Sequence, residues 1–297
     1  MKSYTDLNTE NQNSKTLNIH KLSVSEILIK INDEDKRIAN IVNEAIPDIK
    51  KTIDMTIKSV ESGGRIFYIG AGTSGRLGVL DASEIPPTYS ASPNLFNGII
   101  AGGEKALRNS IEGAEDNSED AIKDLKPYKI NEKDTVIGIS CSGAANYVIS
   151  SLEYSKKKSA KTVYLVTNKK PYKITMVDVI IKADTGPEVV TGSTRMKAGT
   201  ATKMILNMIS TTTMIKVGKV YGNLMVDLMA VNNKLIDRGV RIITKLTNVD
   251  YDFAEKKLFE AEKSVKAAIL MIKLNCSLKI AKEKLNKSGG FLSKIID

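Results

Sequence analysis

The stretch RIFYIGAGTSGRLGVLDASEIPP, residues 65–87, contains the pattern on which the architecture of this chain depends. Its first six residues are a short apolar run, a small-residue loop follows, and RLGVLDAS then has the composition of a helix. A buried strand that passes through a glycine-rich turn into a helix is a building unit of parallel sheets. Four more apolar runs alternate with helical stretches downstream: residues 97–101, 134–140, 162–168 and 178–184. The sequence therefore predicts an α/β protein whose parallel sheet is covered by helices on both faces, a three-layer domain.

The segments on either side of this region are expected to be helical. Residues 23–46 carry isoleucine and valine near a 3.6-residue repeat, and Ser23 with Glu26 forms a capping-box pattern. Pro47 interrupts the repeat, and a second helix is expected after it. After Thr194 the chain is expected to be all helix. The first of these helices is apolar on nearly every face, which is typical of a large core or a subunit interface.

These patterns divide the chain into three parts. We expect an N-terminal arm over residues 1–22, a sheet-containing domain over 23–245 and a small helical C-terminal module over 246–297. No apolar run approaches the length of a membrane helix, and the N-terminus is polar, so the sequence predicts a cytoplasmic protein without membrane contact. The net charge of +10 comes from scattered lysines, which favours a solvated surface over nucleic-acid binding.

The composition also limits the chemistry. The chain has a single histidine, His20, so a Ser-His-Asp triad or a histidine-ligated metal site is hard to build. Its two cysteines, Cys141 and Cys276, provide neither a disulfide framework nor a metal site. Cys141 as a nucleophile is disfavoured, since no histidine is near it in sequence. We therefore expect no metal, and acid–base catalysis falls mainly on carboxylates, lysines or tyrosines.

The glycines Gly70, Gly72 and Gly75 form the pattern G-x-G-x-x-G, which suggests a dinucleotide site. That fingerprint also requires an acidic residue about 20 positions further on, at the end of the second strand, to hold the ribose. Residues 88–101 contain no aspartate or glutamate, and Glu104 follows only after two more glycines. The sequence therefore disfavours NAD, and no cofactor is predicted.

A phosphate-binding interpretation fits better. Hydroxyl-bearing loops precede three helices, at GTS (residues 72–74), SCSG (140–143) and TGST (191–194), and none contains a P-loop lysine. Hydroxyls and backbone N–H groups at a helix start bind anions, although one such loop alone is usually only a helix cap. Three of them predict a monophosphate ligand with a hydroxylated body, such as a sugar phosphate. The predicted binding residues are Gly72, Thr73, Ser74, Ser140, Ser142, Gly143, Ser193, Thr194 and Lys197.

Carboxylates are the candidate acid and base. Glu84 precedes Pro86 and Pro87, which are expected to end its helix. Further on, Glu112, Glu115 and Asp116 are spaced for one face of a predicted helix, a pattern that is also common on solvated helix faces. A sugar-phosphate enzyme without histidine or metal needs two carboxylates whose pKa values differ. Spacing alone does not choose between Glu112 and Glu115.

Four long stretches resemble a known family, and the resemblance covers nearly the whole chain. They are GAGTSGRLGVLDASEIPPTY, GIIAGGEKALRNSIEGAED, EVVTGSTRMKAGTATKMILNMIST and KVYGNLMVDLMAVNNKLIDRGVRI. The chain is similar to the N-acetylmuramic acid 6-phosphate etherases, which belong to the sugar isomerase (SIS) group. The resemblance implies an SIS-type domain, a homodimer with each site near the subunit interface, and neither metal nor nucleotide. It also implies cleavage of the D-lactyl ether by elimination and hydration, giving N-acetylglucosamine 6-phosphate and D-lactate in cell-wall sugar recycling.

The family motif assigns the leaving-group acid to Glu84 and the base that removes the C2 proton to Glu115. One stretch departs from the family pattern, because Ala144, Ala145 and Asn146 replace an arginine, a threonine and a proline. Two alternatives stay open. A sugar-phosphate-sensing regulator of the glucokinase regulatory protein type would not need both glutamates, and a sugar-phosphate isomerase is disfavoured by the shortage of histidine.

Overall fold

The computed structural model describes residues 7–297, and these divide into two compact units. The sheet unit comprises Met1–Ser83 and Asn94–Ser210, and the helical unit comprises Glu84–Pro93 and Thr211–Asp297. Each unit is described separately below.

The sheet has five strands, all parallel, in the order β2-β1-β3-β4-β5. Their bounds are β1 Ile66–Gly70, β2 Phe96–Ile100, β3 Thr135–Ile139, β4 Lys161–Val166 and β5 Val179–Lys182. Strands β1 and β3 are buried along their whole length, as expected for strands covered on both faces. The predicted parallel sheet is thus confirmed, and each strand lies within two residues of its expected bounds.

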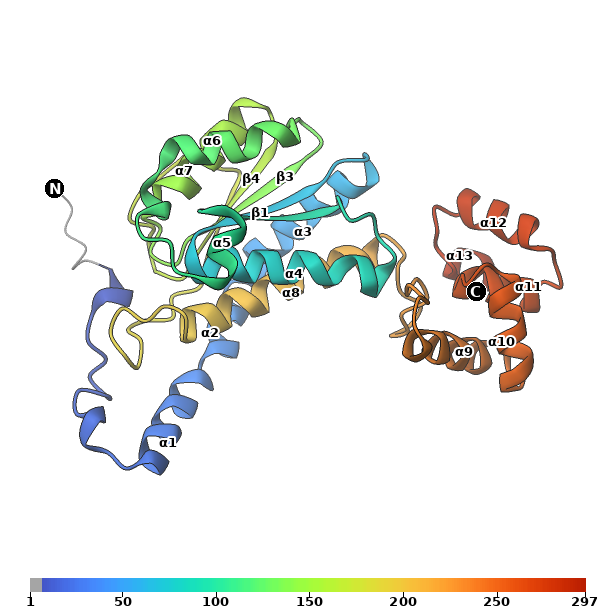
Figure 1. Ribbon diagram of the computed structural model, residues 1–297, viewed down its shortest axis with the longest axis horizontal. Helices are drawn as coiled ribbons and strands as arrows, with labels where there is room; N and C mark the ends of the chain where they lie inside the picture. Colours follow the sequence, from blue (N-terminus) through green and yellow to red (C-terminus); the bar gives the residue numbers. More distant parts are fainter. Residues whose placement is uncertain (1–6) are drawn as a thin grey trace. The chain divides into compact units, whose positions relative to one another are not determined.

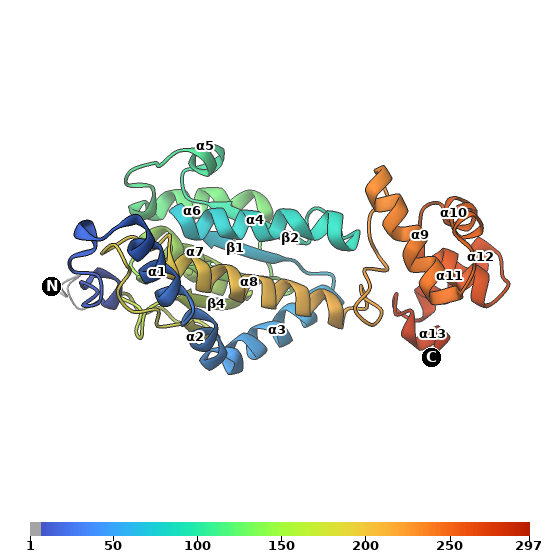
Figure 2. The same cartoon turned by 90° about the horizontal axis from the view of Figure 1, so that it is seen from below.

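Helices cover both faces of the sheet, which makes three layers (Figure 1, Figure 2). The helices that precede, alternate with or directly follow the strands are α1 Val24–Asp35, α2 Ile38–Glu44, α3 Ile46–Glu61, α4 Gly72–Tyr89, α5 Gly103–Arg108, α6 Ser118–Leu125, α7 Asn146–Lys157 and α8 Lys197–Lys216. On one face, Phe67 and Ile69 of β1 join a core formed with α6 and α7. On the other face, Tyr68 of β1 packs against α4. A Cβ atom added at Gly78 of this helix would lie only 2.9 Å from the Cβ atom of Tyr68.

The predicted helix over residues 23–46 is two helices. The capping box at its start is present, with Ser23 accepting from the Glu26 N–H and the Glu26 carboxylate accepting from the Ser23 N–H. The chain leaves the helix at Lys36 and resumes it as α2. Pro47 lies in the first turn of α3, where backbone N–H groups have no partner within the helix. Its missing N–H group therefore does not weaken the helix.

Helix α4 does not end at its prolines, contrary to the prediction. It runs through Pro86 and Pro87 to Tyr89. Each proline removes one N–H donor, and because both stand in the last turn of α4, only the end of the helix loses hydrogen bonds. Glu84 therefore lies inside a continuous helix and is exposed.

The described part of the N-terminal arm, residues 7–22, is anchored to the sheet unit and is not an extended strand of chain. It contains two short 3₁₀ turns, Asn8–Glu10 and Ile19–Lys21. Thr9 is fully buried and exchanges hydrogen bonds with Asn168 at the end of β4: its N–H donates to Oδ1 at 3.4 Å, and its Oγ1 accepts from Nδ2 at 3.2 Å. Asn168 Nδ2 also donates to the carbonyl of Cys141 at 2.9 Å. The arm is therefore connected to the loop that follows β3.

The helical unit has its own core. Its helices are α9 Asn233–Thr247, α10 Tyr251–Glu260, α11 Val265–Lys273, α12 Leu278–Lys287 and α13 Ser293–Ile296. Helix α9 contributes Val240 and Ile243 to this core, so the predicted module boundary at residues 245/246 falls within the unit, at the end of α9. Lys266 is buried beneath these helices and donates to Asp227 and to the carbonyls of Gly218 and Gly290.

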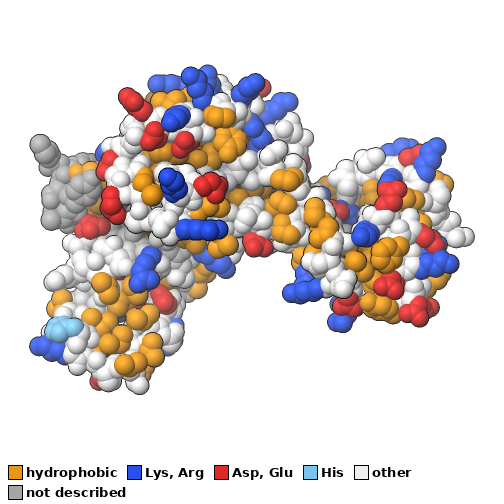
Figure 3. Space-filling view, viewed as in Figure 1, with side chains coloured by type: hydrophobic (Ala, Val, Ile, Leu, Met, Phe, Trp, Pro, Cys, Tyr) orange, Lys and Arg blue, Asp and Glu red, His pale blue; other side chains and the backbone are white. Residues whose placement is uncertain are grey.

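The surface carries both charge signs. On the face shown in Figure 3, lysine and arginine side chains are interspersed with acidic ones. His20 is exposed. Within residues 7–297, no helix combines the length and the apolar character that a membrane crossing would require.

Candidate active site

A cavity of about 350 Å³ opens at the carboxyl ends of β1 and β3 in the sheet unit. This is the edge at which parallel α/β sheets bind their ligands. Seven residues that the sequence predicted for the site line it: Gly72, Thr73, Ser74, Glu115, Ser140, Ser142 and Thr194. The cavity therefore brings together members of all three hydroxyl-bearing loops and one of the two predicted catalytic glutamates.

The first loop allows α4 to begin directly beside β1. A Cβ atom on Gly75 would lie 2.6 Å from the carbonyl oxygen of Gly70, so only glycine permits this approach. Gly72, the first residue of α4, has a φ of 53°, which also favours glycine. Thr73 and Ser74 consequently stand in the first turn of α4 at the cavity, where helix N–H groups and the helix dipole attract an anion.

The second loop, residues 140–145, is held from behind by the chain that follows β4. The N–H groups of Tyr172 and Lys173 donate to the carbonyls of Ser142 and Gly143, at 3.0 and 2.9 Å. Gly143 has a φ of 74°, and a Cβ there would lie 2.7 Å from Pro171. Gly143 does not line the cavity itself, but it allows the close packing that presents Ser140 and Ser142 to it.

Cys141 also lines the cavity but is not poised as a nucleophile. Burial raises the pKa of its thiol above the ordinary value, and hydrogen bonds from nearby hydroxyls only partly oppose this. Its Sγ lies 3.5 Å from Ser74 Oγ. A neutral thiol is a poor nucleophile, so the geometry agrees with the sequence-based argument against cysteine catalysis.

The third loop reaches the cavity through Gly192 and Thr194, whereas Ser193 between them does not line it. The start of α8 is already occupied. The buried carboxylate of Glu188 accepts from the N–H groups of Lys197 and Ala198, at 3.0 and 2.9 Å. The first two N–H groups of α8 therefore serve an internal carboxylate, which leaves the α4 side of the cavity as the better anion site.

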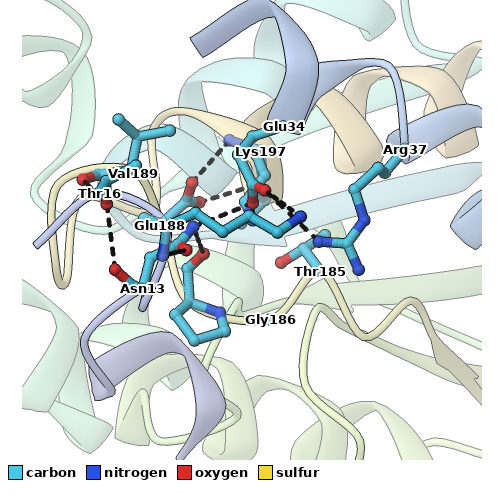
Figure 4. Close-up of polar contacts among 12 residues, drawn as sticks. Asn13, Thr16, Glu34, Arg37, Thr185, Gly186, Glu188, Val189 and Lys197 are labelled. Carbon is cyan, nitrogen blue, oxygen red and sulfur yellow. Dashed lines mark hydrogen bonds and ion pairs between the residues drawn. The ribbon is translucent and has the colours of Figure 1, made fainter. Parts of the chain in front are cut away.

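Lys197 lies away from this cavity and is 2% exposed. Its Nζ donates to Glu34 Oε2 at 2.5 Å, and Asn13 and Lys15 also donate to the Glu34 carboxylate (Figure 4). Burial alone would raise the pKa of Glu34, but these donors outweigh it and lower the pKa to about 2. In the structure Lys197 thus joins α8 to α1 and the arm.

Replacing Glu34 by glutamine should destabilise the protein by about 3 kcal/mol at neutral pH, because it removes the carboxylate that pairs with the buried Lys197 ammonium group. A carboxyl whose pKa is lowered by folding contributes stability above its unfolded pKa of about 4.5, and this contribution is lost as the pH falls toward 2. Urea denaturation at pH 7 and pH 3 would measure both effects.

Asp33→Asn is the matched control, since it breaks an exposed ion pair with Lys36 on the same helix. Its expected cost is below about 1 kcal/mol. Equal destabilisation by Glu34→Gln and Asp33→Asn would contradict the role given to the buried pair.

Glu115 lies on a turn and not on the predicted helix. The helix that was expected to carry Glu112, Glu115 and Asp116 is interrupted between α5 and α6, where Asn109 is extended and Gly113 has a φ of 72°. Glu115 stands in a single 3₁₀ turn, η4 (Ala114–Asp116). The three clustered carboxylates oppose a continuous helix here, because like charges on adjacent turns repel.

The position of Glu115 raises the pKa of its carboxyl above the ordinary value of 4.5. Desolvation of the carboxyl group by the neighbouring protein atoms is the largest cause, and the charges of Asp116 and Glu112 add to it. A carboxylate with a raised pKa is a stronger base once it is deprotonated. Glu112 also lines the cavity, but Ser110 donates to its carboxylate at 2.8 Å.

Glu84 is not among the residues that line this cavity. It lies twelve residues beyond Gly72 on α4, more than three helical turns along. The cavity of the sheet unit therefore contains Glu115 and members of the hydroxyl loops, whereas Glu84 belongs to the helical unit.

The cavity residues outside the predicted site include two charged ones, Glu10 and Arg76. Glu10 lines the cavity because the arm is anchored beside it, which its polar sequence did not indicate. Arg76 lines the cavity from α4 and donates to the carbonyls of Leu107 and Asn109, at 3.1 and 2.8 Å. The position of Arg76 directly after the glycine pattern is the sequence feature that could have indicated a cavity residue. Among residues 7–297 no cluster of three or more histidine, cysteine or acidic side chains is suited to a metal ion.

Comparison with known proteins gives one consistent result. Residues 48–156 match the model of the glucokinase regulatory protein N-terminal SIS domain. A protein of Bacillus cereus (strain AH187) named N-acetylmuramic acid 6-phosphate etherase is 48% identical over 291 residues, which is 98% of this chain and 99% of that protein. A protein of the same name from Bacillus cytotoxicus is 48% identical over 290 residues, with the same coverage.

Among solved structures, the phosphoheptose isomerase of Neisseria gonorrhoeae aligns with a TM-score of 0.44 at 13% identity, covering 64% of this chain and 99% of that one. The parallel sheet, the SIS-domain match and the near-complete coverage at 48% identity agree with one another. The chain belongs to the N-acetylmuramic acid 6-phosphate etherase family.

Proposed function

We propose that this protein is a carbon–oxygen lyase that cleaves the D-lactyl ether of N-acetylmuramic acid 6-phosphate, giving N-acetylglucosamine 6-phosphate and D-lactate. The observation that carries the proposal is the cavity in which Glu115, with its raised pKa, lies beside three hydroxyl-bearing loops. The family to which the chain belongs supports the choice of substrate. The reaction would take place in the cytoplasm as part of cell-wall sugar recycling.

The proposed chemistry has three steps. With the sugar ring open, the C1 aldehyde acidifies the C2 proton, and the Glu115 carboxylate removes it. The electron pair forms the C2–C3 double bond as the C3–O bond breaks, and Glu84 protonates the departing lactate oxygen. Water then adds across the unsaturated aldehyde to restore the hydroxyl at C3. No metal or nucleotide enters this scheme, since each proton transfer is assigned to a carboxyl group or to water.

Phosphate binding is assigned to the first and second loops. Thr73, Ser74, Ser140 and Ser142 offer hydroxyl donors, and the start of α4 offers N–H groups and a favourable dipole. The third loop contributes Thr194, while the start of α8 is occupied by Glu188. For Lys197 and Ser193, which lie outside the cavity lining, we propose a supporting role in holding the third loop.

We also propose that the protein acts as a homodimer and that Glu84 completes the site of the partner subunit. Glu84 is exposed and does not line the cavity of its own chain, yet the proposed elimination requires an acid near C3. A shared site at a two-fold interface would satisfy both conditions.

The direct test is incubation of the purified protein with N-acetylmuramic acid 6-phosphate and enzymatic assay of D-lactate. Lactate and N-acetylglucosamine 6-phosphate should appear in equal amounts. If folded protein binds the substrate and releases no lactate, the lyase proposal is wrong. The sugar-phosphate-sensing regulator, suggested by the SIS-domain match, would then be favoured.

The pH profile offers a finer test of Glu115. Because its carboxyl must be ionised to accept a proton, the acidic limb of kcat/KM should lie above the pH expected of an ordinary glutamate. Glu112→Gln removes one charge that raises this pKa, so the acidic limb should move to lower pH. Glu119→Gln, an exposed change on α6, is the control and should leave the profile in place. A limb that stays fixed in Glu112→Gln would argue against Glu115 as the titrating base.

A further inference from the structure

The turn that holds Glu115 has little support of its own. None of the three residues of η4 is fully buried, although Ala114 packs against the core of the sheet, and the turn is preceded by Gly113 in a left-handed conformation. Two of its backbone N–H groups make local hydrogen bonds, from Ala114 to the Ile111 carbonyl at 3.3 Å and from Asp116 to the Gly113 carbonyl at 3.1 Å. The charges of Glu112, Glu115 and Asp116 repel one another. A base on such a turn needs support from elsewhere to hold one position.

Two side chains provide that support, one at each end of the loop. At its start, Arg76 donates to the carbonyls of Leu107 and Asn109. At its end, Asn146 Nδ2 donates to the carbonyl oxygen of Asp116 at 3.2 Å. This second contact is made to the residue directly after Glu115. It joins η4 to the first residue of α7, which packs against the buried core of the sheet.

Asn146 is itself held in place. Its Oδ1 accepts a hydrogen bond from Lys173 Nζ, which fixes which side of the amide faces Asp116. Lys173 lies in the segment whose backbone holds Ser142 and Gly143 of the second loop. The contacts therefore form a series from the segment after β4, through Asn146, to the turn of Glu115.

We propose that Asn146, oriented by Lys173, is the positioning residue of the catalytic turn: it holds the Asp116 carbonyl so that the Glu115 carboxylate keeps its place in the cavity. The inference rests on the proposed function, in which Glu115 is the base. It gives a role to one of the three residues at which this chain departs from the family pattern. Neither Asn146 nor Lys173 lines the cavity, so both act through the turn and not through the substrate.

The test uses the full-length protein and four variants: Asn146→Ala, Lys173→Met, their combination, and the control Lys170→Met, an exposed lysine on the same segment. Removing the tether should lower kcat and the rate of C2 proton exchange in deuterated water about tenfold. KM and the affinity for N-acetylglucosamine 6-phosphate should stay within about twofold, because the phosphate loops are unchanged. Lys173→Met should show a smaller loss of the same kind.

The combined variant should be no slower than Asn146→Ala, because the lysine acts through the asparagine. Lys170→Met should behave as the wild type. Wild-type rates in Asn146→Ala would overturn the inference, and so would a loss confined to KM. Additive losses in the combined variant would also overturn it, since they would mean that the two residues act separately.

A second measurement separates this inference from the proposed function. Amide hydrogen exchange at residues 113–117 should be faster in Asn146→Ala than in the wild type, whatever reaction the protein catalyses. If the wild type releases no lactate, the proposed function is wrong, but faster exchange would still support the tether. If the wild type is active and exchange at the turn is unchanged in Asn146→Ala, the tether alone is refuted.

Discussion

Replacing Glu115 by glutamine is expected to abolish both lactate release and exchange of the C2 proton. Glutamine keeps the size and polarity of the side chain but cannot accept the proton, so the first step of the elimination stops. Loss of a general base usually lowers the rate by about 10²- to 10⁴-fold. The measurements are lactate release and loss of the substrate C2 proton signal in deuterated water.

Glu112→Gln is the matched control for this experiment, since both glutamates line the same cavity and lie three residues apart. It should keep most of its activity near neutral pH. If Glu112→Gln lost proton exchange while Glu115→Gln kept it, the roles assigned to the two residues would have to be reversed. Retention of exchange in both variants would exclude this carboxylate cluster as the source of the base.

Replacing Glu84 by glutamine is expected to separate the two halves of the reaction. The variant should lose lactate release by about 10²- to 10⁴-fold, because no acid protonates the departing oxygen. The C2 proton should still exchange with solvent, since the Glu115 carboxylate is intact. Ser83→Ala, at the neighbouring exposed position on α4, is the control and should be fully active. Loss of exchange in Glu84→Gln would contradict its assignment as the leaving-group acid.

Mixing Glu84→Gln with Glu115→Gln tests the proposed sharing of the site. If each site takes Glu84 from one subunit and Glu115 from the other, a hybrid dimer has one intact site and one that carries both changes. Random re-association of equal amounts should then restore about a quarter of the wild-type activity. If both glutamates of a site came from one chain, every site in the mixture would carry a change and no activity would return.

The sheet could be predicted from the sequence because its buried strands consist of nearly uninterrupted runs of apolar residues. Residues 66–70, IFYIG, give β1, since side chains of a strand covered on both faces are mostly apolar. The hydroxyl loops could be predicted for a related reason, as the strand order places the ends of β1 and β3 side by side. Local pattern and topology together were enough to identify seven of the residues that line the cavity.

The parts that could not be predicted depend on contacts between distant residues. The spacing of Glu112, Glu115 and Asp116 suits a helix, but Gly113 in a left-handed conformation and the tethers at Arg76 and Asn146 favour a turn. Nothing in the local sequence of Glu10 indicates a cavity residue, because Asn168, which anchors the neighbouring Thr9, lies 159 positions away from it. Lys197 occurs among hydroxyl residues, yet its partner, Glu34, is on α1.

The anchoring of the arm has a consequence for how the cavity is assembled. Thr9 pairs with Asn168, 159 positions later, and its carbonyl accepts from the N–H of Gly192. Thr9 is therefore synthesised long before Asn168 and Gly192, and it can form these hydrogen bonds only after most of the sheet unit has been made. Contacts of such long range are slow to form, so the wall that contains Glu10 is expected to close last during folding. An assay of newly made chains should detect the buried sheet before it detects a cavity able to bind a sugar phosphate.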